Sequence, residues 1–248
     1  ARMPHVTLTA NSQRAAAAYE DWLDLAPGTV QVIPNAVNVM TSDGDATDTA
    51  LWSDILSQTE TCIKTVLGVF RFDSNKRPLQ WVETAARYLA RHDDTRFVML
   101  GDGALLPETR ALIDELGLSH RIFAVGIRSN VGFYMHRADL LMHLAQMEGL
   151  PNVLIESQLV GTPVLATPAG GTDEVVEHGL TGIILSDADA IPEQELDTAL
   201  ATLLADPEQL ARLGATAMAH SVDRFSVETI LNRTTDLFNT IETIEQAY

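Results

Sequence analysis

The chain has 248 residues, of which 46% are hydrophobic, and a formal net charge of −18. This hydrophobic content is enough for one large domain, or for one domain plus part of another. The negative charge argues against a nucleic acid partner, because proteins bind nucleic acids largely through Lys and Arg side chains that neutralise the phosphates. It also argues against a general attraction to anionic lipids. The single cysteine, Cys62, excludes an internal disulfide framework and a cysteine-rich zinc site, and it fits a reducing compartment.

The start of the chain predicts a short strand, a helix and a second strand. Residues 5–10 have a strand-like pattern, residues 11–25 predict a helix that a Pro-Gly pair ends, and residues 29–34 predict the second strand. The start lacks the regions of a signal peptide and begins abruptly, so we expect a truncated chain. Residues 41–63 are polar and rich in turn residues, and predict a linker with one helix around residues 50–58.

From residue 64 onward the sequence alternates between strand and helix patterns. The first strand, 65–72, is almost continuously apolar, as in a parallel sheet that is buried on both faces. An amphipathic helix follows over 77–92, with Pro78 in its first turn. The alternation predicts an α/β fold, a Rossmann-like, doubly wound parallel sheet with helices on both faces. The other expected strands are 96–103, 121–126, 139–145, 163–167 and 181–186, and the other expected helices are 106–118, 130–138, 151–160, 172–179 and those from residue 191 to the end.

Two cations follow the first strand of this sheet. Arg71 and Lys76 are five positions apart on the loop that leaves the strand. Ligands of such sheets bind at the carboxyl ends of the strands, so these two side chains could clamp an anion such as a diphosphate. Solvated loop charges are the alternative interpretation of the same spacing.

A second group surrounds a turn in the stretch MEGLPNVLIESQLVGTPVLATPAGG, residues 147–171. Gly149 and Pro151 predict a tight turn with Pro151 as the first helical residue, so the backbone N–H groups of the helix start would form an anion site. Glu148 precedes this start and could accept hydrogen bonds from sugar hydroxyls. Glu156 lies among apolar residues and could hold a ribose diol. Alternatively, one carboxylate interacts with the helix dipole and the other is partly exposed.

Other motifs give weaker signals. Glycine turns at 100–103 and 125–130 match neither a dinucleotide-binding nor a P-loop pattern. Two Asp-x-Asp sequences, 43–45 and 187–189, lie in acidic turns, so we expect solvated loops there and no metal site. The seven histidines lack the spacing of metal ligands, and His143, within a strand, is expected to pack or to bond locally.

Taken in order, these motifs resemble the retaining GT-B glycosyltransferases of family 4, the glycosyl transferases group 1. Glu148 and Glu156 have the family's E-x7-E spacing within EGLPNVLIE, and Arg71 and Lys76 match its strand-end Arg and Lys. The runs GDG, RADLL, GTPVLAT and the later GG, EVV and TG also fall in family order. The resemblance covers nearly the whole chain. Phe70 departs from the pattern, because the family usually has glycine before the Arg.

The resemblance also implies how the chain divides. Residues 1–40 resemble the tail of the N-terminal acceptor domain, so that half is expected to be largely missing, and residues 41–63 resemble the interdomain linker. Residues 64–225 would be the nucleotide-sugar-binding domain, which is the GT-B C-terminal domain. The last helix, 226–248, would cross back to the missing half. Its apolar face would therefore meet the N-terminal domain or another chain.

The implied function is transfer of a sugar, with retention at the anomeric carbon, from a nucleotide-sugar to a glycan or lipid-linked acceptor in cell-surface polysaccharide synthesis. A UDP-sugar is favoured as donor and a GDP-sugar comes next. No metal or other cofactor would be required, and the location would be cytoplasmic, peripheral at the inner membrane face through the missing half. The catalytic residues would be Arg71, Lys76 and Glu148, and the donor-binding residues would be Gly126, Ile127, Arg128, Gly149, Leu150, Pro151, Asn152, Val153 and Glu156.

Two alternatives stay open. One is a non-catalytic module that binds sugar nucleotides, since the fragment could bind a donor yet transfer nothing. The other is a GT-B sugar-nucleotide epimerase, which would need further acid and base residues between the domains.

Overall fold

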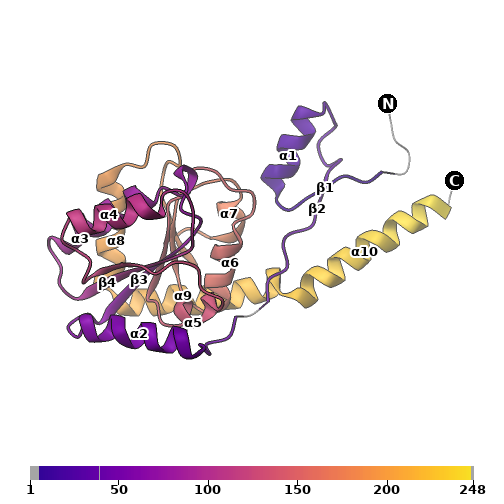
Figure 1. The fold of residues 1–248 in the computed structure, drawn as a ribbon. Helices are drawn as coiled ribbons and strands as arrows, with labels where there is room; N and C mark the ends of the chain where they lie inside the picture. Colours follow the sequence, from indigo (N-terminus) through magenta and orange to yellow (C-terminus); the bar gives the residue numbers. More distant parts are fainter. Residues whose placement is uncertain (1–5, 39, 247–248) are drawn as a thin grey trace.

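The computed structural model describes residues 6–38 and 40–246, and it contains a larger α/β body and a smaller unit near the N-terminus (Figure 1). In the smaller unit, strands β1 (Thr9–Ala10) and β2 (Gln31–Val32) pair in parallel beside helix α1 (Gln13–Trp22). Both strands are shorter than predicted, and residue 5 of the first lies outside the described residues. Each strand has only the other as its neighbour, so little of either is held in a sheet.

The larger body contains a parallel sheet of six strands in the order β5-β4-β3-β6-β7-β8. This order confirms the predicted Rossmann-like, doubly wound sheet. Within this sheet, β3 comes first in the sequence, β4 and β5 follow on one side of it, and β6, β7 and β8 follow on the other side. The strand order therefore reverses between β3 and β6, which places a crevice at their carboxyl ends. The strands are β3 (Lys64–Val69), β4 (Thr95–Leu100), β5 (Ile122–Ala124), β6 (Leu140–His143), β7 (Val164–Ala166) and β8 (Gly182–Ile184).

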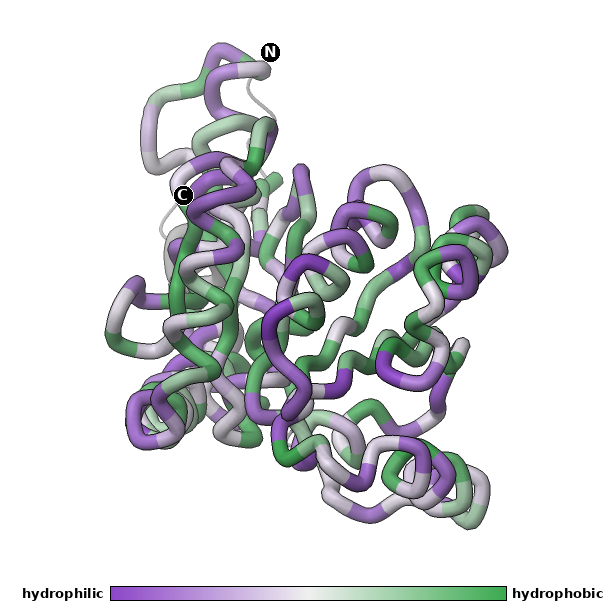
Figure 2. The backbone as a smooth tube through the Cα atoms, turned by 90° about the vertical axis from the view of Figure 1, so that its left-hand side faces the viewer, coloured by the Kyte–Doolittle hydropathy of each residue, from purple (hydrophilic) through white to green (hydrophobic). Residues whose placement is uncertain are grey.

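Helices cover both faces of this sheet (Figure 1). Side chains alternate along β3, so Val66 and Leu67 join different hydrophobic clusters, one on each face. Along the outer helices, single turns contain both hydrophobic and hydrophilic residues, as burial of one helix face requires (Figure 2). The helices are α2 (Ala46–Gln58), the 3₁₀ turn η1 (Ser74–Lys76), α3 (Pro78–Leu89), α4 (Leu106–Glu115), α5 (Val131–Met135), α6 (Asn152–Leu159), α7 (Thr172–Val175), α8 (Glu193–Ala205) and α9 (Pro207–Phe225).

Helix α2 lies within the range expected to be a linker and is longer than the helix predicted there. It starts at Ala46 because the Asp45 side chain caps it, accepting a hydrogen bond from the Asp48 backbone N–H. Trp52 and Ile55 are buried in the cluster beneath one sheet face. This part of the range 41–63 is therefore packed onto the sheet.

The last helix, α10 (Val227–Gln246), follows α9 after a break at Ser226 and extends away from the larger body, past the smaller unit (Figure 1). Ser226 forms a bridge with Val37, where the chain enters the larger body. Ile230 is buried, but Leu231 and Phe238 are each 61% exposed. Much of the described apolar surface of α10 is thus uncovered. No helix in the described part of the chain is both long and apolar enough to cross a bilayer.

Candidate functional site

The loops after β3 and β6 meet at the point where the strand order reverses. The loop after β3 forms the turn η1, which Asp73 caps by accepting a hydrogen bond of 3.1 Å from the Lys76 backbone N–H. The Lys76 ammonium forms an ion pair with Oε1 of Glu148, on the loop after β6. The two side chains are only 16% and 14% exposed. The fold thus brings together two predicted site residues that are 72 positions apart.

Asn75 fixes the Glu148 loop (residues 144–149) against this turn. Its backbone oxygen accepts a hydrogen bond of 2.9 Å from the Gln146 N–H. Its side chain accepts one of 2.7 Å from the Met147 N–H and donates one of 3.0 Å to the Met147 carbonyl. The position of Glu148 relative to Lys76 is therefore set by backbone hydrogen bonds as well as by the ion pair.

The segment after β7 holds the other side of the Glu148 loop. The Thr167 hydroxyl donates a hydrogen bond to the Ala145 carbonyl, and the Gly171 N–H donates one of 2.7 Å to the Gly149 carbonyl. Gly170 has a φ of +52°, and a Cβ at this position would lie 1.9 Å from the Glu148 backbone oxygen. A side chain at residue 170 is thus excluded by this close approach.

His143, the last residue of β6, also contacts Glu148. Its Nε2 lies 2.7 Å from Glu148 Oε1, and its side chain is 2% exposed. As expected, this histidine bonds locally. Burial lowers the pKa of His143 and so favours the neutral ring. Burial acts to raise the pKa of Glu148, but hydrogen bonds from His143 and Lys76 and the charge of Lys76 outweigh it, so the pKa lies below the usual range. Glu148 is therefore a carboxylate at neutral pH.

Helix α6 starts next to this carboxylate. Pro151 precedes the helix as its N-cap, and the prediction that it is the first helical residue is wrong, because its ψ of 98° is extended. No described residue accepts a hydrogen bond from the backbone N–H of Asn152 or Val153. Asn35 of the smaller unit donates a hydrogen bond of 2.6 Å to the Asn152 side chain. Two N–H groups at this helix start are thus available to an anion.

Glu156 lies on α6, half-buried among apolar residues. Burial raises the pKa of its carboxyl group. Among the described residues, no side chain or backbone group forms a hydrogen bond or ion pair with this carboxylate. A carboxylate in this setting is costly for the fold and would gain from a ligand that donates hydrogen bonds.

Arg71 lies on the same loop as Lys76, and Asp73 binds both the Arg71 side chain and the Lys76 backbone N–H. The Arg71 side chain is 74% exposed and forms an ion pair with Asp73. It also lines a cavity of about 270 Å³ together with Ile127 and Arg128, which follow β5. The Gly126 carbonyl accepts a hydrogen bond of 3.0 Å from the Gly101 N–H, which ties the start of this β5 loop (residues 125–130) to the end of β4.

The predicted residues therefore take part in two sets of contacts, and Asp73 links the two sets. Lys76 and Glu148 meet at the crevice, with the α6 start next to Glu148 in the chain, and Arg71 meets Ile127 and Arg128 across the smaller cavity. In the described part of the chain, Glu156 forms no hydrogen bond or ion pair with any of these residues. Sequence reasoning missed Asn75, which carries no signal beyond its place next to Lys76. It also missed the partner of His143, for which a polar residue in an apolar strand was the only hint.

Phe70, where the sequence departs from the resembled pattern, points its side chain into the core. Its ring is 7% exposed and lies 5.2 Å from the ring of Phe72 and 6.3 Å from that of Trp81, centroid to centroid. Gly68 leaves room for it, since a Cβ there would lie 2.6 Å from the Phe70 ring. The bulky residue is therefore accommodated without filling the crevice.

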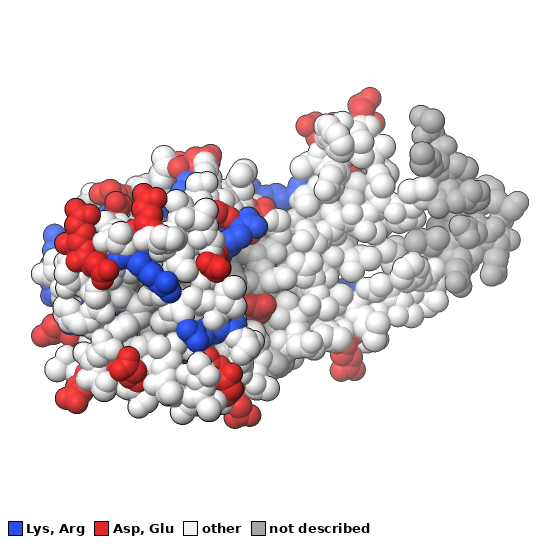
Figure 3. Space-filling model, in the orientation of Figure 1, with Lys and Arg blue, Asp and Glu red and all other residues white. Residues whose placement is uncertain are grey.

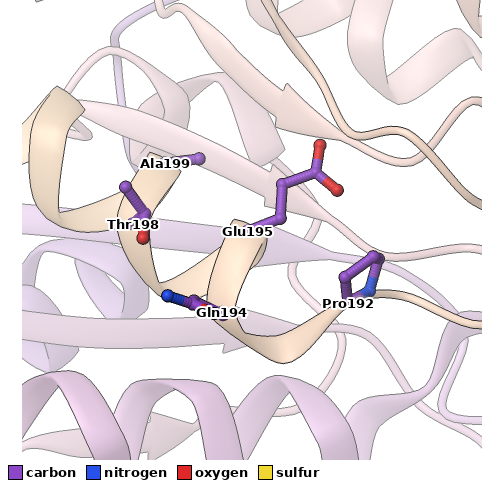
Figure 4. Close-up of a pocket in the computed structure, with 5 residues that line it drawn as sticks. All are labelled: Pro192, Gln194, Glu195, Thr198 and Ala199. Carbon is purple, nitrogen blue, oxygen red and sulfur yellow. The ribbon is translucent and has the colours of Figure 1, made fainter.

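A larger surface hollow of about 520 Å³ lies elsewhere, at the start of α8 (Figure 4). It is lined by Pro192, Gln194, Glu195, Thr198 and Ala199, and none of these is a cation. On the face shown in Figure 3, basic side chains lie singly among acidic ones and form no continuous basic patch. The hollow is unsuited to a phosphate, so the anion-binding groups of the crevice remain the stronger candidates.

Comparisons with known proteins identify the family of the chain. The profile of the family described as glycosyl transferases group 1 matches residues 60–220, which is more than half of the chain. The chain belongs to the glycosyl transferases group 1 family. It is 38% identical, over 190 residues, to the Vi polysaccharide biosynthesis protein VipC/TviE of Salmonella typhi. That match covers 76% of this chain and 33% of the relative.

Solved structures of other proteins share the fold. The crystal structure of Anabaena Alr3699/HepE in complex with UDP has a TM-score of 0.81 at 24% identity, over 95% of this chain and 64% of that one. The structure of HepE in complex with UDP-glucose has a TM-score of 0.78 at 26% identity, over 95% and 64%. The chain thus spans about a third of VipC/TviE and somewhat less than two thirds of HepE.

Proposed function

We propose that this chain is the donor-binding half of a retaining glycosyltransferase that uses a nucleotide-sugar. The observation that carries the proposal is the Lys76–Glu148 pair at the β3–β6 reversal, beside the open N–H groups of the α6 start. A lysine ammonium has three donors, so Lys76 can bind a phosphate while it keeps Glu148. A cation, backbone donors and a carboxylate side by side suit a phosphate that is linked to a sugar.

Each predicted residue has a place in this proposal. Arg71 and Lys76 would hold the diphosphate and stabilise the charge that develops on the leaving group. Glu148, with the backbone of residues 149–153, would bind the donor sugar and the distal phosphate. Glu156 would accept the two ribose hydroxyls, which would supply the hydrogen bonds that its carboxylate lacks. The cavity lined by Arg71, Ile127 and Arg128, next to Gly126 in the chain, would take the nucleobase.

The proposed reaction is a front-face attack through an oxocarbenium-like state, in which the leaving phosphate helps to deprotonate the acceptor. No metal is required in this scheme, because Arg71 and Lys76 supply the positive charge. UDP is favoured as the nucleotide, and the 26% identity to HepE, which was solved with UDP-glucose, supports it. The acceptor would be a glycan or lipid-linked glycan in polysaccharide biosynthesis, which the similarity to VipC/TviE supports.

Calorimetry with UDP, GDP, ADP and UDP-glucose tests the donor site. We expect UDP to bind, and the Arg71→Ala and Lys76→Ala variants each to lose about 10- to 100-fold in affinity, as for charge-assisted hydrogen bonds. Arg91→Ala is the matched control, since this cation is exposed and remote from the crevice. Unchanged affinity in both clamp variants would overturn the proposed site. Binding of UDP-glucose without transfer or hydrolysis, by a protein of the full length of the relatives, would favour the non-catalytic module.

A further inference from the structure

The buried histidine next to the crevice uses only one of its two ring nitrogens. Nε2 of His143 lies 2.7 Å from Oε1 of Glu148, and the Lys76 ammonium binds the same oxygen. Nδ1 of His143 is buried and has no hydrogen-bond partner among the described residues. Oε2 of Glu148 likewise has no partner in the described part of the chain. One carboxylate oxygen is thus held twice and the other is left free.

The contact defines which nitrogen carries the proton. The charged groups that face His143 are Glu148 and Lys76. Glu148 acts to raise the pKa of His143, but burial outweighs this effect and favours the neutral ring. A neutral imidazole next to a carboxylate must donate its hydrogen bond, so the proton lies on Nε2 and Nδ1 is a bare acceptor. A buried acceptor without a partner is unfavourable for the fold.

Packing alone does not explain a histidine at this position. The other β6 residues, Leu140, Leu141 and Met142, are fully buried and apolar, and an apolar side chain at residue 143 would fill the same space without the unpaired nitrogen. The residue with the unpaired Nδ1 is therefore also the residue whose Nε2 bonds to Glu148, the carboxylate that binds Lys76.

We propose that His143 is a positioning residue, whose Nε2–H holds Oε1 of Glu148 together with Lys76 so that Oε2 is presented to a hydroxyl group of the bound sugar. The proposal rests on the proposed function, in which Glu148 binds the donor sugar. His143 is enclosed within the core and acts through Glu148 alone. Loss of His143 should therefore lower the affinity for ligands that carry the sugar and leave the affinity for the nucleotide alone unchanged.

Two substitutions separate the hydrogen bond from the packing. Gln at residue 143 can place an N–H donor where Nε2 lies, whereas Leu cannot. We expect His143→Leu to lower the affinity for UDP-glucose about 10-fold, as for loss of a hydrogen bond to a charged group, and to leave that for UDP unchanged. His143→Gln should restore the affinity for UDP-glucose. His120→Leu is the control, because this histidine is exposed.

NMR of the ligand-free protein provides a readout that does not depend on binding. We expect the ¹⁵N shifts of His143 to show the neutral tautomer with the proton on Nε2. The hydrogen bond stabilises the carboxylate form of Glu148, so His143→Leu should raise the pKa of Glu148, and His143→Gln should not. A purely structural role for His143 predicts no such difference between folded variants.

Each outcome decides the matter. A folded His143→Leu variant with unchanged UDP-glucose affinity and unchanged Glu148 titration would overturn the proposal. If this variant does not fold, the tautomer in the unaltered chain and the Glu148 titration of His143→Gln decide, and a proton on Nδ1 would contradict it. If the chain binds neither UDP nor UDP-glucose, the proposed function fails. The NMR titrations then still show whether His143 holds Glu148.

Discussion

The Glu148 loop and the β5 loop lie at the two ends of the proposed site and are held very differently. The first is hydrogen-bonded by Asn75 on one side and by Thr167 and Gly171 on the other. The second is tied to β4 at its start and, through the Asn130 side chain, to Thr41 and Asp43 at its end, while Ile127 between them is 70% exposed. The sugar end is therefore ordered before a ligand binds, so little entropy is lost there on binding, whereas only the exposed middle of the β5 loop can adjust to the base.

The largest expected effect comes from closing the space behind the Glu148 loop. Gly170→Ala places a Cβ 1.9 Å from the Glu148 backbone oxygen, and the loop must shift. We expect a loss of about 3 kcal/mol in the free energy of unfolding, from overpacking plus backbone strain. Gly126→Ala in the β5 loop is the matched variant. Its φ of +79° is strained too, but the nearest atom is 3.8 Å away, so about 1 kcal/mol is expected.

Urea denaturation measures both variants, and calorimetry with UDP-glucose measures the loop. Equal losses of stability in the two variants would break the comparison, because strain alone would then explain both. A Gly170→Ala variant that binds UDP-glucose normally would show that the Glu148 loop need not be fixed.

The next effect concerns the hydrogen bonds of Asn75. Asn75→Ala removes two side-chain hydrogen bonds to Met147 and so releases the Glu148 loop. We expect the affinity for UDP-glucose to fall about 10-fold, and that for UDP to fall less, because UDP lacks the sugar. Asn232→Ala on α10 is the control, since this side chain is exposed and remote. Equal losses for the two ligands would contradict the assignment of this loop to the sugar.

A smaller effect is expected at the other end. Arg128→Ala removes a side chain that lines the cavity beside Arg71. Because this end would contact the nucleotide and not the sugar, UDP and UDP-glucose should lose affinity equally, by about 3- to 5-fold, as for one hydrogen bond. Titration calorimetry with both ligands checks this equality. A selective loss for UDP-glucose would reverse the proposed orientation of the donor.

The smallest effect is a gain in stability. The pKa of Glu156 is raised by burial, so its ionisation opposes folding above that pKa and has no effect well below the usual Glu value. Glu156→Gln should therefore stabilise the chain by about 1 kcal/mol at pH 7, roughly 2–4 °C in Tm, and the gain should vanish near pH 4. Thermal melts at both pH values measure it, with the exposed Glu115→Gln as control. A gain that persists at low pH would exclude the ionisation as its cause.

The sequence predicted the larger α/β body well because its strands are apolar runs that end in turn residues. Val66 and Leu67 show why, since each enters a different buried cluster. Local pattern failed where tertiary contacts decide. Helix α2 looked like part of a linker, because Trp52 and Ile55 are few among polar residues, and only the sheet beneath explains its length. The sequence pattern predicted Pro151 as the first residue of its helix, whereas it is the N-cap.

In the candidate site, spacing identified Lys76 and Glu148 but not the groups that hold them. Asn75 acts through hydrogen bonds to a segment remote in the sequence, and no pattern at residue 75 announces them. His143 was recognised as a polar residue in a strand, but its partner depends on how the chain turns after β6. The conformations of the loops, and the hydrogen bonds that depend on them, could therefore not be predicted from the sequence.

The ion pair between Lys76 and Glu148 also connects the loop after β3 to the loop after β6. It therefore joins the half of the sheet that contains β3, β4 and β5 to the half that contains β6, β7 and β8. A nucleotide that bridges them would fasten strands β6 to β8 to the first half of the sheet. Amide hydrogen exchange in those three strands should then slow when the ligand is bound, because partial opening that separates the two halves would require the ligand to leave.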